Sequence, residues 1–193
     1  MDTSEIQNSL KYKLGDKIEY LGVFTSDHIT NIKINKYRIK VVGFICNTLE
    51  STDSATIMGH WVAFAIDKSP NDRIIFFDSY GFDPRLYAKG FRRFIDNNRN
   101  FKLFSFDRQY QLDTSYKCGL YTIFFIHNIS LEGLRQTIIK IRSNLKQGNG
   151  HQNDEFVSRY YLKHITSGNC QQWRNKNGKT AFTYQECKNL LNR

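Results

Sequence analysis

The pattern of apolar and polar positions along the chain predicts strands and helices that alternate. Apolar runs bounded by polar turns predict strands at Tyr37–Cys46, His60–Asp67, Arg73–Asp78 and Phe101–Phe106. Lys17–Phe24 is only partly apolar and leads into a polar loop. Helical spacing and capping residues predict helices at 3–10, from Asp83-Pro84 onward, at 131–145, at 154–165 and at 183–191. These elements predict an α+β fold in which helices flank a mixed central sheet, and the absence of repeats and linkers predicts one domain over residues 1–193.

The stretch Tyr116–Ile129 contains a cysteine near its start and then runs into a continuous apolar segment. Thr114 and Ser115 precede it and are residue types that cap helix N-termini. Cys118 is therefore expected in the first turn of a buried helix, where backbone N–H groups and the helix dipole lower a thiol pKa. The sequence leaves open a plain alternative, in which this cysteine is a small apolar residue of the core.

The two strands that follow residue 59 predict a hairpin with candidate catalytic residues at its open end. Antiparallel pairing about Ser69 places His60 directly opposite Asp78, on one face of the sheet. The carboxylate can then orient the imidazole and leave its other ring nitrogen free to take the proton of Cys118. Trp61 is expected to cover the imidazolium through a cation–π contact. Alternatively, His60 is a structural or solvated histidine and Asp78 a turn residue.

Gln111 lies seven residues before Cys118, across a polar turn. Its side-chain amide and the backbone N–H of Cys118 can together stabilise a developing oxyanion. Gln109 is the competing choice for this role. His127 is expected to point away from the thiol, because it follows nine residues later on the same helix. Three more cysteines are expected to be inert: Cys46, Cys170 and Cys187.

These residues carry a resemblance to a known family. GHWVAFAID, FFDSYGFDPRLY, Gln111 and YKCGLYTIFFIHNI resemble the maturation proteases of adenoviruses, which are cysteine endopeptidases of adenain type, and the likeness covers roughly residues 17–130. It implies the papain-related fold that these proteases share with SUMO-type deconjugases, and a source in an adenovirus-like virus, virophage or polinton-like element. It also implies a role for each matched residue: nucleophile Cys118, base His60, orienting acid Asp78, oxyanion donors Gln111 and the backbone N–H of Cys118, and supporting residues Trp61 and Gly119.

The resemblance implies cleavage of viral capsid or core precursors at small-residue, Gly-containing sites during virion maturation. A monomer is expected, acting in the virion and in the infected cell, either in the nucleus or in a cytoplasmic virus factory. No metal or other required cofactor is implied. Two alternatives stay open: an isopeptidase that removes a ubiquitin-like modifier, and a non-catalytic nucleic-acid-binding protein with the same fold.

Charge and cysteine usage add expectations about partners. The net charge is +10, and residues 131–193 hold 11 Lys and Arg against 4 Asp and Glu, so this region is expected to bind double-stranded DNA non-specifically. The sequence shows no signal peptide and no apolar run that would span a membrane. The four scattered cysteines indicate reduced thiols. Because none lies between Cys46 and Cys118, any activating peptide is expected to bind reversibly, without the disulfide tether implied for the adenoviral enzymes.

Overall fold

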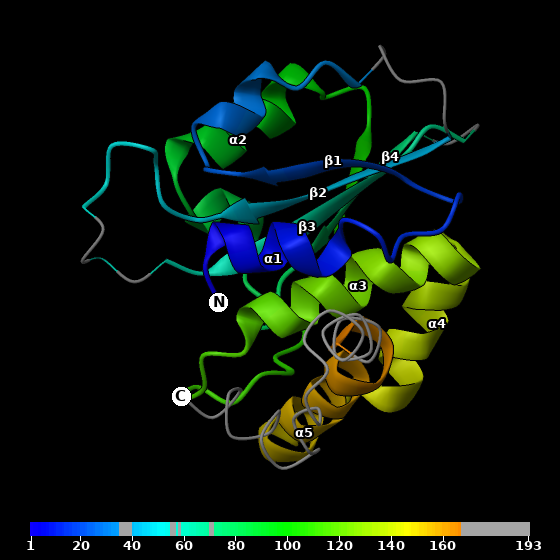
Figure 1. Ribbon diagram of the computed structural model, residues 1–193. Helices are drawn as coiled ribbons and strands as arrows, with labels where there is room; N and C mark the ends of the chain where they lie inside the picture. Colours follow the sequence, from blue (N-terminus) through cyan, green and yellow to red (C-terminus); the bar gives the residue numbers. More distant parts are fainter. Residues whose placement is uncertain (35–39, 55–56, 58, 70–71, 167–193) are drawn as a thin grey trace, which may run out of the picture.

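The structure is a computed structural model that describes residues 1–34, 40–54, 57, 59–69 and 72–166. Its helices are α1 (Thr3–Leu10), α2 (Lys89–Asn97), α3 (Cys118–Glu132), α4 (Leu134–Asn144) and α5 (Gly150–Tyr161). Its strands are β1 (Glu19–Phe24), β2 (Val41–Asn47), β3 (Trp61–Asp67), β4 (Arg73–Phe77) and β5 (Lys102–Ser105). Short helical turns are η1 (His28–Asn31), η3 (Pro84–Leu86) and η4 (Leu162–Thr166). The prediction of an α+β fold with a mixed sheet between helices is confirmed (Figure 1).

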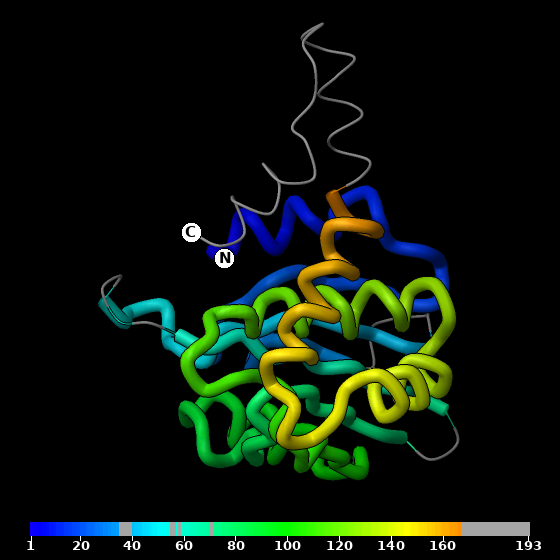
Figure 2. Tube along the Cα trace, turned by 90° about the horizontal axis from the view of Figure 1, so that it is seen from below, coloured from blue at the N-terminus to red at the C-terminus, as the bar shows by residue number. Residues whose placement is uncertain are grey.

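The sheet separates two hydrophobic cores. Its strands lie in the order β1-β2-β3-β4-β5, with β1–β2 and β4–β5 parallel and the two central pairs antiparallel. One core packs the sheet against η1 and α2, with Phe44, Phe64 and Phe94 in mutual ring contact. The other core packs the opposite face against α3, around which α1, α4 and α5 are arranged (Figure 2). Among the described residues, no helix combines the length and the apolar character needed to cross a membrane.

Helix α3 is the centre of the second core. Every residue from Cys118 to Ser130 is buried, as expected for a helix that is apolar on all sides. Phe77 of β4 stacks on Phe125 at 4.8 Å and ties the helix to the sheet. The predicted cap is wrong: Lys117 is the N-cap residue and makes no side-chain capping bond. The carbonyl of Ser115 is instead bound by Gln111, and the chain turns before the helix begins.

The hairpin of β3 and β4 forms, but its predicted register is wrong. The prediction pairs Ala63 with Ile75, whereas the structure pairs Ala63 with Phe77, a shift of two residues. A shift of two preserves the face on which each side chain lies, since side chains alternate along a strand. His60 and Asp78 therefore still share a face, as diagonal rather than directly opposite neighbours.

Four predicted elements have different limits in the structure. Asp83 caps a short turn, η3, and a separate helix, α2, begins at Lys89. The predicted helix at 131–145 is divided at Gly133, whose positive φ of 87° ends α3 before α4 begins. The helix predicted at 154–165 begins earlier, at Gly150, and continues into η4. The strand predicted at Tyr37–Cys46 is observed as Val41–Asn47; residues 35–39 and the helix predicted at 183–191 lie outside the described residues.

Candidate active site

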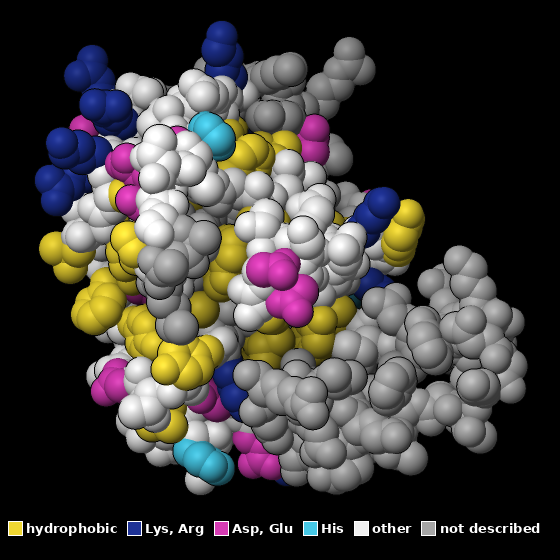
Figure 3. Space-filling model, turned by 60° about the vertical axis from the view of Figure 1, so that its left-hand side comes forward, with side chains coloured by type: hydrophobic (Ala, Val, Ile, Leu, Met, Phe, Trp, Pro, Cys, Tyr) yellow, Lys and Arg dark blue, Asp and Glu magenta, His cyan; other side chains and the backbone are white. Residues whose placement is uncertain are grey.

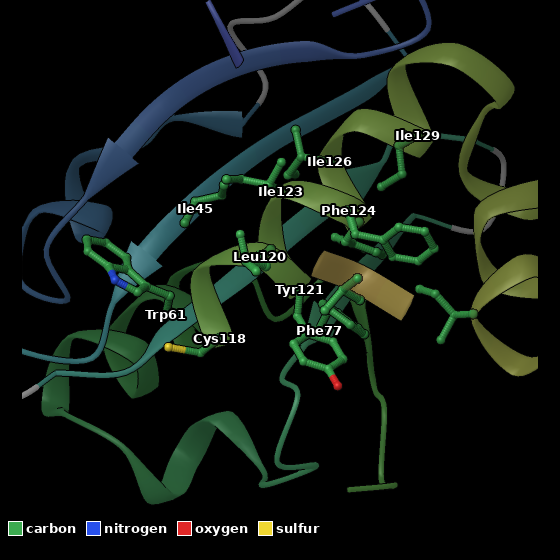
Figure 4. Packing of buried hydrophobic residues seen from close by; sticks show 14 of the residues in the cluster. Ile45, Trp61, Phe77, Cys118, Leu120, Tyr121, Ile123, Phe124, Ile126 and Ile129 are labelled. Carbon is green, nitrogen blue, oxygen red and sulfur yellow. The ribbon is translucent and has the colours of Figure 1, made fainter. Parts of the chain in front are cut away.

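Four separate segments deliver the predicted site residues to one end of the sheet. His60 immediately precedes β3 and Asp78 immediately follows β4, so the antiparallel pairing brings them together. Cys118 is the first residue of α3, which packs on this sheet, and Figure 4 shows it at the end of the buried cluster beside Trp61. Gln111 lies in the connection from β5 to α3. The structure thus brings all four predicted residues into one site.

The imidazole of His60 is held by a fully buried carboxylate. Its Nε2 lies 2.6 Å from Oδ1 of Asp78, a side chain with no exposed surface. Asp78 also accepts bonds from the backbone N–H groups of Tyr80 and Phe82, both at 2.9 Å, and from the hydroxyl of Tyr87 at 2.7 Å. Both carboxylate oxygens are therefore fixed. Because Nε2 is bound to Asp78, Nδ1 of His60 is the nitrogen left for the thiol.

The thiol and the imidazole form a hydrogen-bonded pair with shifted protonation. Burial raises the pKa of the Cys118 thiol, but the hydrogen bond and charge of His60, with the N–H groups of Trp61 and Gly119, outweigh burial and lower it. Burial likewise lowers the pKa of His60, but its hydrogen bonds to Asp78 and Cys118 outweigh this and raise the pKa to about 9. The lowered pKa of the thiol and the raised pKa of the imidazole both favour the thiolate–imidazolium pair, which is the reactive form of a cysteine nucleophile.

The amide of Gln111 is buried, and its partners determine its orientation. Its Oε1 accepts a hydrogen bond from Ser79 Oγ at 2.7 Å. Its Nε2 donates to the carbonyl of Ser115 at 2.7 Å and to the hydroxyl of Tyr80 at 3.2 Å. Gln109, the competing choice, is exposed and donates to Asp113 and to the carbonyl of Gln111. Of the two glutamines, Gln111 is therefore the one built into the site.

The structure does not show the cation–π contact that was predicted between Trp61 and His60. Its indole is buried in the core and donates to the carbonyl of Met1 at 3.0 Å. The rings in contact with His60 are Tyr80, at 4.7 Å between centroids, and Tyr87, at 6.0 Å. Consecutive residues on an extended chain point to opposite faces, so Trp61 turns away from the imidazole that His60 presents. Trp61 still contributes to the site through its backbone N–H, which bonds the thiol.

Gly119 packs closely beside the nucleophile. A Cβ at this position would lie 3.2–3.4 Å from side-chain atoms of Met1 and Ile6, so a larger residue would require these side chains to shift. Tyr80 and Tyr87 are site residues that the sequence analysis missed. The signal was present in FFDSYGFDPRLY, where two tyrosines follow the acid, but their contacts depend on how the chain turns after β4.

Other polar groups lie apart from this site. Nδ1 of His127 lies 2.6 Å from the hydroxyl of Tyr160, at the α3–α5 contact. Cys46 is fully buried in the other core, and burial raises its pKa. Within the described ranges, no group of three or more His, Cys, Asp and Glu side chains is arranged to bind a metal ion. Cys170 and Cys187 lie outside the described residues.

The paired charges predict a specific pH dependence of thiol reactivity. Iodoacetamide should alkylate Cys118 faster at pH 6 than it alkylates an unassisted cysteine, because the hydrogen bond and charge of His60 help to lower the pKa of the thiol. In the His60→Ala variant the rate at pH 6 should fall at least about tenfold, since an unassisted thiol with a pKa of about 8.5 is mostly protonated there. Turnover should decline as pH rises through about 9, where His60 loses its proton. Alkylation rates, assigned to Cys118 by peptide mass spectrometry, check this.

A matched control is His151→Ala, because His151 is exposed on α5. This variant should keep the wild-type rate at pH 6. Equal rates for wild type and His60→Ala at that pH would contradict the ion pair.

Known proteins resemble this chain in sequence or in fold. A family model described as adenovirus endoprotease matches residues 20–191. Among solved structures, the ASFV pS273R protease is similar, with 16% identity, a TM-score of 0.51, and coverage of 86% of this chain and 67% of that one. The central domain of the uncharacterised Lpg1148 protein from Legionella pneumophila has 13% identity, a TM-score of 0.49, and coverage of 86% and 98%. No curated protein matches the chain.

The fold and the family match define a cysteine protease of viral type. More specifically, the chain belongs to the adenovirus endoprotease family.

Proposed function

We propose that this protein is a cysteine endopeptidase that cleaves viral capsid or core precursor proteins at small-residue, Gly-containing sites during virion maturation. The observation that carries the catalytic part is the buried set of hydrogen bonds from Asp78 through His60 to Cys118, with Gln111 beside it. The family match supports the viral substrate class. Cys118 serves as nucleophile, His60 as base and acid, Asp78 as its orienting group, and Gln111 and the backbone N–H of Cys118 as oxyanion donors.

The arrangement supports a two-stage acyl transfer. The thiolate Sγ of Cys118 attacks the scissile carbonyl carbon, an S–C bond forms, and the carbonyl π electrons move to oxygen. When the C=O bond re-forms, the C–N bond breaks and His60 transfers its proton to the leaving amine nitrogen. Water then attacks the thioester carbon while His60 takes a proton from that water molecule. The S–C bond breaks, the acid product leaves, and the thiolate is restored.

The test is incubation of the purified protein with capsid and core proteins encoded beside it, with Cys118→Ala as the inactive control. Wild-type cleavage at Gly-containing sites is expected, also under a strong reductant, because we propose that no disulfide tethers an activator. A thiol-reactive activity probe that ends in Gly-Gly separates the alternative isopeptidase activity from the endopeptidase activity. Labelling and processing of a ubiquitin-like modifier, with no cleavage of capsid proteins, would replace the proposal by an isopeptidase.

We also propose that double-stranded DNA is a non-specific partner. Exposed cations are present on α4, on α5 and in the loop between them, namely Arg135, Arg142, Lys146 and Arg159. A second exposed set lies on and before α2, namely Arg85, Lys89, Arg92 and Arg93. Figure 3 shows one group of Lys and Arg side chains at the upper left of the face it presents, with others scattered over that face. Such surfaces bind phosphates without reading bases.

Binding to a random duplex should therefore depend steeply on salt. Four or five phosphate contacts predict an affinity loss of about 150- to 500-fold between 50 and 200 mM salt. Fluorescence anisotropy at both concentrations checks this, and the charge reversals Arg135→Glu/Arg142→Glu and Arg92→Glu/Arg93→Glu locate the surface. Absence of binding at low salt would contradict the DNA proposal while leaving the protease proposal intact.

A further inference from the structure

Tyr80 lies between the His60–Asp78 pair and the side-chain amide of Gln111. A turn from Asp78 to Gly81 places it there, with the N–H of Gly81 donating to the carbonyl of Asp78 at 3.2 Å. Gly81 has a φ of +76°, and a Cβ on it would lie 2.7–2.9 Å from the backbone of Arg108. The N–H of Tyr80 donates to Asp78 Oδ1. The acid that orients His60 therefore also holds the backbone of Tyr80.

The two ends of the Tyr80 side chain contact different functional groups. Its ring lies on the imidazole of His60, 4.7 Å between centroids and tilted by 31°. Its hydroxyl accepts a hydrogen bond from Gln111 Nε2 at 3.2 Å. The residue is only half-buried, so part of its surface remains accessible to solvent.

The hydroxyl proton of Tyr80 has a poor partner in the free protein. Its contact with the carbonyl of Ser115 is 3.4 Å long, whereas Gln111 donates to that same carbonyl at 2.7 Å. Burial, followed by the charge of Cys118, raises the pKa of Tyr80, so the hydroxyl keeps its proton at neutral pH. Accepting a bond from the amide also polarises the O–H group and makes it a better donor. Tyr80 is thus a protonated donor with spare capacity beside the glutamine amide.

From these contacts we propose that the hydroxyl of Tyr80 is a further oxyanion donor, acting beside Gln111 and the backbone N–H of Cys118. The inference rests on the proposed protease function. When Sγ bonds to the scissile carbon and the π electrons move to oxygen, the oxyanion that Gln111 Nε2 stabilises lies within reach of Tyr80 Oη. Tyr80 donates a hydrogen bond and keeps its proton, so the stoichiometry of the reaction is unchanged. Tyr80 is then a catalytic residue.

The test is Tyr80→Phe, which removes the hydroxyl and keeps the ring on His60. With a fluorogenic Gly-Gly peptide amide, kcat should fall about 100-fold and KM should change little, the signature of a lost transition-state donor. Alkylation of Cys118 by iodoacetamide should keep the wild-type rate and pH profile, because that displacement at a CH₂ carbon develops no carbonyl oxyanion. Tyr116→Phe is the control, since Tyr116 is 74% exposed in the loop before α3 and should keep full activity.

The outcomes separate this inference from the proposed function. Wild-type kcat in Tyr80→Phe would overturn the donor role while the protease function stands. An equal fall in hydrolysis and alkylation would also overturn it, because it would show that the hydroxyl positions His60 or Cys118 instead. A wild-type chain that hydrolyses neither the Gly-Gly amide nor capsid proteins would overturn the protease function itself, and with it this role.

Discussion

Cys118→Ala is expected to abolish peptide hydrolysis while the fold survives. The change removes the sulfur that receives hydrogen bonds from His60, Trp61 and Gly119, so no atom remains to form the thioester. Loss of the nucleophile in a comparable triad enzyme lowers kcat about a million-fold. Replacing one sulfur by hydrogen in a residue that is 8% exposed should cost only about 1 kcal/mol of folding stability. Single-turnover kinetics and thermal melting on the same preparation check both parts.

The matched control is Cys46→Ala. Cys46 is also buried, but it lies in the core on the other face of the sheet and its thiol donates to its neighbour Asn47 at 3.2 Å. This variant can lose stability but should retain kcat wherever it is folded. Hydrolysis by Cys118→Ala at a near wild-type rate would refute the assignment of Cys118 as nucleophile.

The parts of the site that the sequence predicted are those set by local patterns. The apolar segment after Lys117 predicted a buried helix beginning near Cys118, and α3 begins there. Alternating strands around a short turn predicted that His60 and Asp78 would meet. That meeting survives an error of two residues in register because side-chain direction repeats every second residue. An error of one would have separated them.

The parts that the sequence missed depend on contacts between distant segments. Tyr87 reaches Asp78 only because η3 and the turn after it fold back over the end of β4. The hydrogen-bond partner of the Trp61 indole is the carbonyl of Met1, sixty residues earlier. Local propensity carries no information about such partners.

Gln111→Ala is expected to lower kcat about 100- to 1000-fold with little change in KM, as is typical when one oxyanion donor is removed. The structure gives the amide little freedom: Ser79 fixes its oxygen, and the carbonyl of Ser115 takes one amide hydrogen. The other amide hydrogen is directed at the phenol oxygen of Tyr80. A developing oxyanion can share this hydrogen with the phenol oxygen or replace the phenol oxygen as its acceptor. Such pre-organisation is what makes a donor effective in the transition state.

Truncating Gln111 also leaves the buried hydroxyl of Ser79 without its acceptor, which costs about 1–3 kcal/mol of stability. Thermal melting must therefore accompany the kinetics, and Gln111→Glu is a useful second variant. It keeps an acceptor for Ser79 but replaces the amide donor by an oxygen, so kcat should fall at least as far as in Gln111→Ala. Gln109→Ala should do little, because that side chain is exposed and binds only Asp113 and the carbonyl of Gln111.

The kinetics of these variants decide whether Gln109 or Gln111 is the oxyanion donor. They also test whether Gln111 and Tyr80 act together. A large fall in kcat for Gln109→Ala, with Gln111→Ala near wild type, would reverse the assignment. If Gln111 and Tyr80 stabilise one oxyanion, the loss in the double variant Gln111→Ala/Tyr80→Phe should be smaller than the two single losses combined, since donors in one network are coupled. Fully additive losses would mean that the two groups act independently, and the hydrogen bond between them would then have no part in catalysis.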